Sequence, residues 1–140
     1  MSDHMEVDVV SPDGLIWHGD ATSVIVRTTE GDIGILRNHE PLMAAMVPCA
    51  AEVVTADGQR MVIAVGGGFI SVFANRVSLL SDSAELAESI SLADAEKELA
   101  ALLEMHDEGQ LDRRSTMRLH QLQAQMKAGE RFAQLSGVDV

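Results

Sequence analysis

The chain has 140 residues, the length of one domain or of one core with an appendage. Its formal net charge of −12 argues against binding to nucleic acid, which requires a basic surface, and against electrostatic docking to anionic lipid. Hydrophobic residues make up 46% of the chain but aromatic residues only 3%, so we expect an aliphatic core.

The sequence shows no signal for membrane insertion. The N-terminus lacks the basic and apolar segments of a signal peptide, and no run approaches the ~18 apolar residues that span a bilayer. The single cysteine, Cys49, cannot form an internal disulfide, which favours a reducing compartment. We therefore expect a protein that is soluble or reaches a membrane through a partner.

The first part of the chain carries the pattern of short β-strands joined by turns. Apolar and acidic residues alternate over residues 5–9, SPDG at 11–14 is a turn, and Asp57-Gly58 is a hairpin signal. Such spacing is typical of a β-sandwich or barrel. The predicted strands are residues 5–9, 15 to about 19–20, 22–29, 31–36, 42–47, 50–55, 61–65, 69–73 and 77–80.

Beyond residue 83, the apolar period lengthens to about 3.6, which predicts helices. Ser91, followed three residues later by an acid, resembles the cap of a helix that runs to about His106. Gly109 suits the end of this helix, and Asp112 suits the N-cap of a second one. The predicted fold is a β domain of about 85 residues followed by an antiparallel helical hairpin.

The two predicted helices carry opposite charge. Residues 86–108 contain seven acids and one base, a net charge of −6, whereas residues 111–131 contain five bases and two acids, a net charge of +3. One interpretation is that the helices attract each other across a solvated hairpin, each exposed pair contributing about 0–1 kcal/mol. The other is that the basic helix can leave for an acidic surface elsewhere, so that both states belong to one switching element.

Residues 31–43, GDIGILRNHEPLM, combine a short strand with a polar corner. Pro41 fixes its own φ and favours an extended conformation at Glu40. The plain interpretation is an exposed turn at the end of a strand. The sharper interpretation is a rigid loop that presents Asp32 and the titratable His39 to a partner.

No catalytic, metal or cofactor site is predicted. The glycines at 66–68 lack the lysine and the spacing of a phosphate-binding loop, so we expect a close approach of backbones there. The five histidines show no metal-ligand spacing, and no nucleophile signature is present. Cys49 lies in an apolar segment and is expected to be buried. A small stand-alone enzyme is therefore disfavoured.

Three segments together resemble the ε subunit of bacterial F-type ATP synthases: residues 31–43, AVGGGFISV at 64–72 and NRVSLLSDSAE at 75–85. The likeness covers nearly the whole chain in order. It implies a non-catalytic central-stalk subunit with a ten-stranded β-sandwich, residues 1–86, followed by a helix–turn–helix, residues 87–140. It also implies a peripheral position, without membrane insertion, on the cytoplasmic face of the bacterial plasma membrane.

The resemblance implies that the β-sandwich binds the γ subunit and the ring of c subunits. One loop and one corner of the sandwich are expected at the ring surface. Most relatives have proline where Arg37 stands, and a cationic Arg37 beside Asp32 is expected to alter that contact. The residues assigned to the ring interface are Glu30, Asp32, Arg37, Asn38, His39 and Leu42.

The resemblance also implies a regulatory role for the helices. In the family they can extend along γ and inhibit ATP hydrolysis in the α/β catalytic head, where basic residues of the second helix meet acidic segments of β. The candidates for this role are Arg113, Arg114, Arg118 and Lys127.

An ATP-sensing regulatory module is the alternative hypothesis. Some family members bind ATP through a motif like I-D-x-x-R-A at the start of the first helix. The aligned run is ISLADA, residues 90–95, in which Ser91 replaces the acid and Asp94 replaces the arginine. A carboxylate there repels a triphosphate, so we expect ATP binding to be weak or absent.

Overall fold

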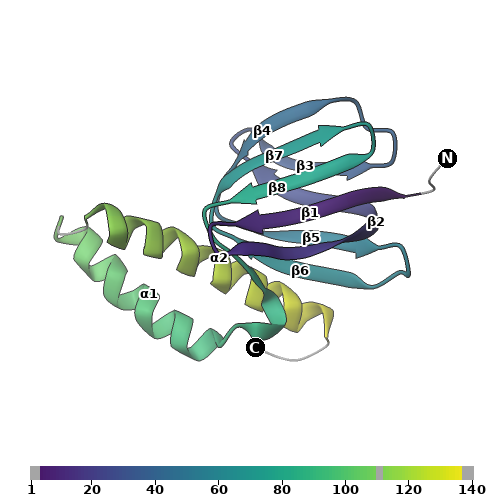
Figure 1. The fold of residues 1–140 in the computed structure, drawn as a ribbon. Helices are drawn as coiled ribbons and strands as arrows, with labels where there is room; N and C mark the ends of the chain where they lie inside the picture. The colour runs from purple at the N-terminus through teal and green to yellow at the C-terminus, as the bar shows by residue number, and fades with distance from the viewer. Residues whose placement is uncertain (1–3, 110–111, 137–140) are drawn as a thin grey trace.

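The computed structural model describes residues 4–109 and 112–136 of the chain. A β-sandwich is followed by two antiparallel helices, which confirms the predicted fold class (Figure 1). The described residues form nine strands, whereas the family resemblance implied ten. The elements are β1 (Met5–Ser11), β2 (Gly14–Thr28), β3 (Gly31–Leu36), β4 (Leu42–Met46), β5 (Cys49–Thr55), β6 (Arg60–Val65), β7 (Gly68–Phe73), β8 (Arg76–Ser81), β9 (Ala84–Leu86), the short 3₁₀ helix η1 (Ala87–Ser89), α1 (Leu92–Asp107) and α2 (Arg113–Leu135).

The sandwich has two layers that share β2. One layer contains β4, β7, β8, β1 and the first half of β2, and the other contains β3, the second half of β2, β5, β6 and β9. The prediction of two strands, one from residue 15 to about 19–20 and one at 22–29, is wrong, because β2 is continuous. Its register with β5 shifts between Ala21 and Ser23, and such an irregularity bends a strand without ending it.

The core between the layers is aliphatic, as predicted. β1 alternates buried and half-buried residues along its whole length. Val7, Val24, Ile63 and Leu79 are fully buried, and each such side chain stabilises the fold by about 1.5–3 kcal/mol. Cys49 is also buried, in agreement with the sequence analysis.

The change from strands to helices comes later than the sequence pattern indicated. Residues 84–86 form β9, which pairs with β6 through Ile63 opposite Leu86 and Val65 opposite Ala84. A strand of three residues is too short to show a period of two, so its sequence cannot be told from the start of a helical segment. The sandwich therefore ends at Leu86.

The glycines at 66–68 lie where backbone segments meet. At Gly68, φ is +120°, and an added Cβ would overlap the carbonyl oxygen of Leu80 and lie 2.8 Å from the Cα of Ser81. We expect Gly68→Ala to lower the free energy of unfolding by about 3 kcal/mol or more, because backbone strain and overpacking act together.

A matched control for this substitution is Gly34→Ala in β3. A Cβ at Gly34 meets no atom within 4 Å, so this variant should cost less than about 1 kcal/mol. Urea unfolding of the two variants measures the difference. Equal unfolding midpoints would show that the β6–β7 connection is not tightly packed.

The predicted helix ends are confirmed. The Ser91 hydroxyl accepts a hydrogen bond from the amide of Asp94 at 3.4 Å, and the Asp112 carboxylate accepts one from the amide of Ser115 at 2.8 Å. Gly109 has φ of +72°, the left-handed conformation that follows many helix ends. Local capping chemistry therefore sets where both helices begin and where α1 ends.

The hairpin packs on the outer face of β5 and β6 through α2, while α1 lies outside α2 (Figure 1). Small side chains make much of the contact with the sheet: Ala124 and Ala128 of α2 meet Val62 and Ala64 of β6. Since α1 packs on α2 and Ala95 is its one buried residue among those described, α1 depends on α2 for its position.

Candidate functional site

β3 is an edge strand, because among the described strands it pairs with β2 alone. Glu30 lies in the turn before β3, and Arg37 and Asn38 lie in the loop after it. Six residues of strand separate these positions by roughly 20 Å. Five of the six predicted ring-interface residues therefore lie along one edge of the sandwich, which we call the β3 edge (residues 30–41), and Leu42 lies in β4.

Asp32 is held by an arginine that the sequence analysis did not single out. Arg27 lies opposite Asp32 in the β2–β3 register and donates to both carboxylate oxygens, Nε to Oδ1 at 2.8 Å and Nη2 to Oδ2 at 3.2 Å. These hydrogen bonds lower the pKa of Asp32 and raise the pKa of Arg27. The sequence analysis places Arg37 beside Asp32, whereas the bidentate partner of Asp32 in the structure is Arg27.

The loop after β3 is fixed to the turn between β7 and β8. The amide of Asn38 donates to Oδ1 of Asn75 at 2.6 Å, and Nδ2 of Asn75 donates to Oδ1 of Asn38 at 3.1 Å. Both asparagines have positive φ, which this residue type tolerates well. His39 donates its amide to the carbonyl of Leu36 at 3.1 Å. This end of the β3 edge is consequently a preformed surface.

The structure changes the role expected of Leu42. Its side chain is half-buried and packs against the core, whereas the side chain of Met43 is 71% exposed. Successive residues of a strand face opposite sides, so only one of the two can face a partner. Met43 is the side chain that β4 presents outward.

An apolar row crosses the outer face of the first layer and was not visible in the sequence. The register places its members opposite one another on five neighbouring strands. Three of them are exposed to 53%, 49% and 63%, which is high for large apolar side chains. In order across the sheet, the members of the apolar row are Ala45, Phe69, Leu80, Val10 and Leu15.

Aromatic residues strengthen the case that this face is a docking surface. The chain has only three phenylalanines, and all three are exposed: Phe69, Phe73 and Phe132. Phe69 belongs to the apolar row, and Phe73 lies on the same face of β7. A chain so poor in aromatic residues that leaves its phenylalanines outside the core is expected to use them against a partner.

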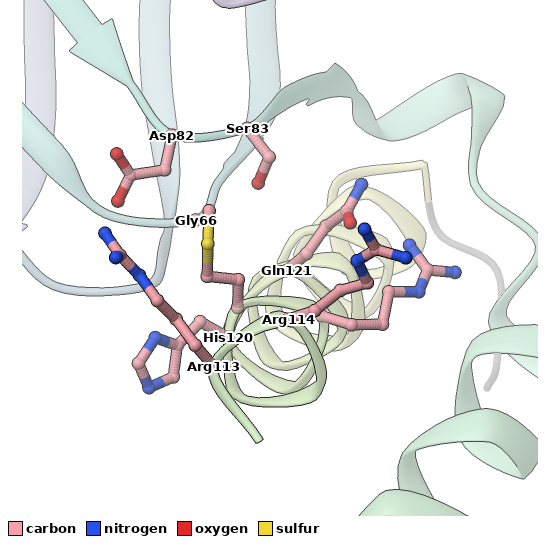
Figure 2. Close-up of a pocket in the computed structure, with 9 residues that line it drawn as sticks. Gly66, Asp82, Ser83, Arg113, Arg114, His120 and Gln121 are labelled. Atoms are coloured by element: carbon pink, nitrogen blue, oxygen red, sulfur yellow. The ribbon is translucent and has the colours of Figure 1, made fainter. Parts of the chain in front are cut away.

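Three of the four predicted regulatory cations line one hollow of about 590 Å³. Arg113, Arg114 and Arg118 come from the first turns of α2. Arg113 points toward Asp82, which lies with Ser83 on the connection between β8 and β9 (Figure 2). We call this feature the cationic hollow. Lys127 lies elsewhere: its Nζ donates to the carbonyl of Pro48 at 3.2 Å.

The three arginines of the cationic hollow differ in their burial and in their ion pairing. Arg118 is half-buried and donates through Nη2 to Oε1 of Glu98 at 2.9 Å and through Nε to the other carboxylate oxygen. This pairing lowers the pKa of Glu98 and raises the pKa of Arg118. Arg113 and Arg114 are exposed at the start of α2. The hairpin therefore neutralises Arg118 internally and leaves two cations facing outward.

Two other kinds of site would involve a membrane-spanning helix or a bound metal ion. Among residues 4–109 and 112–136, no helix is both long and apolar enough to cross a membrane. The same residues contain no cluster of three or more histidine, cysteine or acidic side chains placed to hold a metal ion.

Comparison with known proteins places these surfaces in context. Residues 4–87 match the family described as "ATP synthase, Delta/Epsilon chain, beta-sandwich domain". The chain is 42% identical over 132 residues to the ATP synthase epsilon chain of Cutibacterium acnes, covering 89% of this chain and 90% of that one. It is 39% identical over 124 residues to the ATP synthase epsilon chain of Streptomyces avermitilis, covering 89% and 99%.

The fold agrees with this assignment. A chain in the Euglena gracilis mitochondrial ATP synthase structure, described as OSCP/F1/c-ring in rotational state 1, superposes with a TM-score of 0.70 at 20% identity. The match covers 96% of this chain and 83% of that one. The matched sandwich domain and the bacterial relatives show that the chain belongs to the ATP synthase ε-chain family.

Proposed function

We propose that the chain is the ε subunit of the central stalk of a bacterial F-type ATP synthase, on the cytoplasmic face of the plasma membrane. In this role it couples ion translocation through the c ring to rotary ATP synthesis and restrains ATP hydrolysis through its helices. The observation that carries the proposal is that the chain presents three separate outward surfaces. Two of them, the apolar row and the β3 edge, belong to the sandwich, and the third is the hairpin. A coupling subunit has to hold several partners at once without catalytic chemistry of its own.

We assign the apolar row to the γ subunit. A large contiguous apolar patch is uncommon on a monomer unless a partner covers it. The surface belongs entirely to residues 1–86, so the γ contact in this proposal is independent of the helices at 87–140. The end of the last strand at Leu86 supports this division.

We assign the β3 edge to the c ring. Its outward side chains are mostly polar and charged, with Leu36 as an exposed apolar exception, and its far loop is held in place by the Asn38–Asn75 pair. The Arg27–Asp32 pair gives the edge a fixed, locally neutral contact. A polar, preformed edge suits a contact that must transmit torque without burying a large apolar area.

Chemical cross-linking tests the ring assignment. Glu30→Cys and Arg37→Cys place a reactive thiol at the two ends of the β3 edge, while Glu96→Cys places one on exposed α1 as the control. The native Cys49 is buried and should not compete. With a benzophenone label in the assembled complex, we expect both edge variants to cross-link to subunit c and the control not to. Absence of c adducts from both edge variants would refute the ring assignment.

We assign the cationic hollow to inhibition of the catalytic head. Its arginines suit an acidic protein segment, because guanidinium groups bind carboxylates with paired hydrogen bonds. In the closed hairpin, Arg118 is occupied by Glu98, so full use of this surface requires the hairpin to open. Closed and open hairpins then correspond to permissive and inhibitory states.

ATP sensing remains the alternative function. Asp94 lies in the first turn of α1, where its amide donates a hydrogen bond to the Ser91 hydroxyl. No arginine stands at that position to meet a phosphate. We expect calorimetry to detect no micromolar ATP binding, and a micromolar dissociation constant would favour the alternative.

A further inference from the structure

The contact between α2 and the sandwich is anchored by one acidic residue. Glu52 of β5 has a side chain only 15% exposed. It accepts two hydrogen bonds from Arg131 of α2, Nε to Oε2 at 3.1 Å and Nη2 to Oε1 at 3.2 Å. It also accepts one from Arg60, Nη1 to Oε1 at 3.1 Å. One nearly buried carboxylate thus serves two arginines.

The two arginines belong to different bodies. Arg60 is in β6, the strand paired with β5, and it stays with the sandwich whatever the hairpin does. Arg131 lies near the end of α2, 79 residues from Glu52 in sequence. If α2 left the sheet, Arg60 would still neutralise Glu52, so the carboxylate would not be stranded without a counter-charge. The free-energy cost of moving α2 away from the sheet is therefore lower than it would be if Arg131 were the sole counter-charge of Glu52.

The other contacts between α2 and the sandwich are of a different kind. Single hydrogen bonds join Gln125 to Glu85 at 2.8 Å and Lys127 to the carbonyl of Pro48 at 3.2 Å. The apolar contact with β6 relies on Ala124 and Ala128, whose small side chains bury little area. Glu52–Arg131 is the bidentate charge-assisted contact that joins α2 to the sheet among the described residues, and its directional hydrogen bonds fix the docked position.

We propose that the Glu52–Arg131 pair is the latch that determines how often α2 leaves the sandwich. The role of the latch in controlling ATP hydrolysis rests on the proposed inhibitory function. The attachment of α2 to the sandwich by this pair does not depend on that function and can be tested on the isolated chain. Opening the latch frees Arg131 together with Lys127, so the released helix presents more positive charge than the docked one. The docked state is accordingly weakened by salt and by any competing acidic partner.

Hydrogen exchange of the full chain tests the latch. We expect Arg131→Met to speed exchange of α2 amides near residues 124–133 by about tenfold, because a helix off the sheet frays. Arg60→Met is the matched control, because it removes an arginine from the same carboxylate and keeps the Glu52–Arg131 hydrogen bonds. The exchange rate of α2 amides in this variant should be unchanged or lower than in the wild type. Amides of β1 and β8 serve as the internal reference for global stability.

Two results would overturn the latch. In the first, Arg131→Met leaves α2 exchange at the wild-type rate, and apolar packing alone holds the helix. In the second, Arg131→Met and Arg60→Met speed exchange equally, so that Glu52 only stabilises the sandwich. ATP hydrolysis by the reconstituted complex is measured separately. If Arg131→Met speeds α2 exchange but leaves hydrolysis unchanged, the latch is supported and the inhibitory function is rejected. If α2 exchange stays at the wild-type rate while the complex still shows inhibition, the latch is rejected and the inhibitory function is kept.

Discussion

Replacing both Phe69 and Leu80 by aspartate is expected to weaken binding of purified γ at least about 100-fold. These neighbours form the centre of the apolar row, and each is about half exposed in the free chain. Truncating a central interface residue commonly costs 2 kcal/mol or more, and two buried carboxylates would add a desolvation penalty. Surface plasmon resonance with the full chain measures the change.

The control for this prediction is Leu103→Asp on α1. Leu103 is also an exposed leucine, but it lies on the hairpin, away from the apolar row. It should leave the affinity for γ unchanged. If the control weakened binding as much as the double variant, the γ contact would not depend on this face of the sandwich.

Reversing the charge of Arg113, Arg114 and Arg118 to glutamate is expected to raise ATP hydrolysis by the reconstituted complex about fivefold or more. The three arginines line one hollow, and the substitution turns a site for carboxylates into one that repels them. Assembly should be retained, because the changed residues lie outside the sandwich. Steady-state ATPase assays on complexes of verified subunit content measure the effect.

Lys97→Glu provides the comparison for charge reversal on the hairpin. Lys97 is an exposed cation of α1 outside the cationic hollow. Hydrolysis should remain at the wild-type level with this variant. Unchanged hydrolysis in the triple variant would mean that the cationic hollow has no part in inhibition.

Local features of this fold were predictable from the sequence. The caps at Ser91 and Asp112 depend on a side chain and an amide three residues away, so the information is contained in a short window. The alternation in β1 likewise reports directly on burial. Such signals located both helices and most of the strands.

Features that depend on register were not predictable. The apolar row joins Val10 to Leu80 through the parallel β1–β8 pairing, and no short window contains that relation. The pairing of Glu52 with Arg131 spans 79 residues and requires the docked helix. The continuity of β2 depends on an irregular register with β5 between Ala21 and Ser23, next to the point where the sequence pattern indicated a break. Non-local pairing therefore decided the surfaces that matter most for function.

Co-elution with γ is the most direct test of the central claim that the sandwich binds the stalk and the hairpin regulates. The full chain is compared with residues 1–86, whose main core cluster lies wholly within the sandwich and should support independent folding. Near-ultraviolet circular dichroism of Trp17 checks that the shorter chain is folded. We expect both to co-elute with γ. Co-elution of the full chain alone, with residues 1–86 folded, would make the hairpin a structural part of the γ contact and contradict the account.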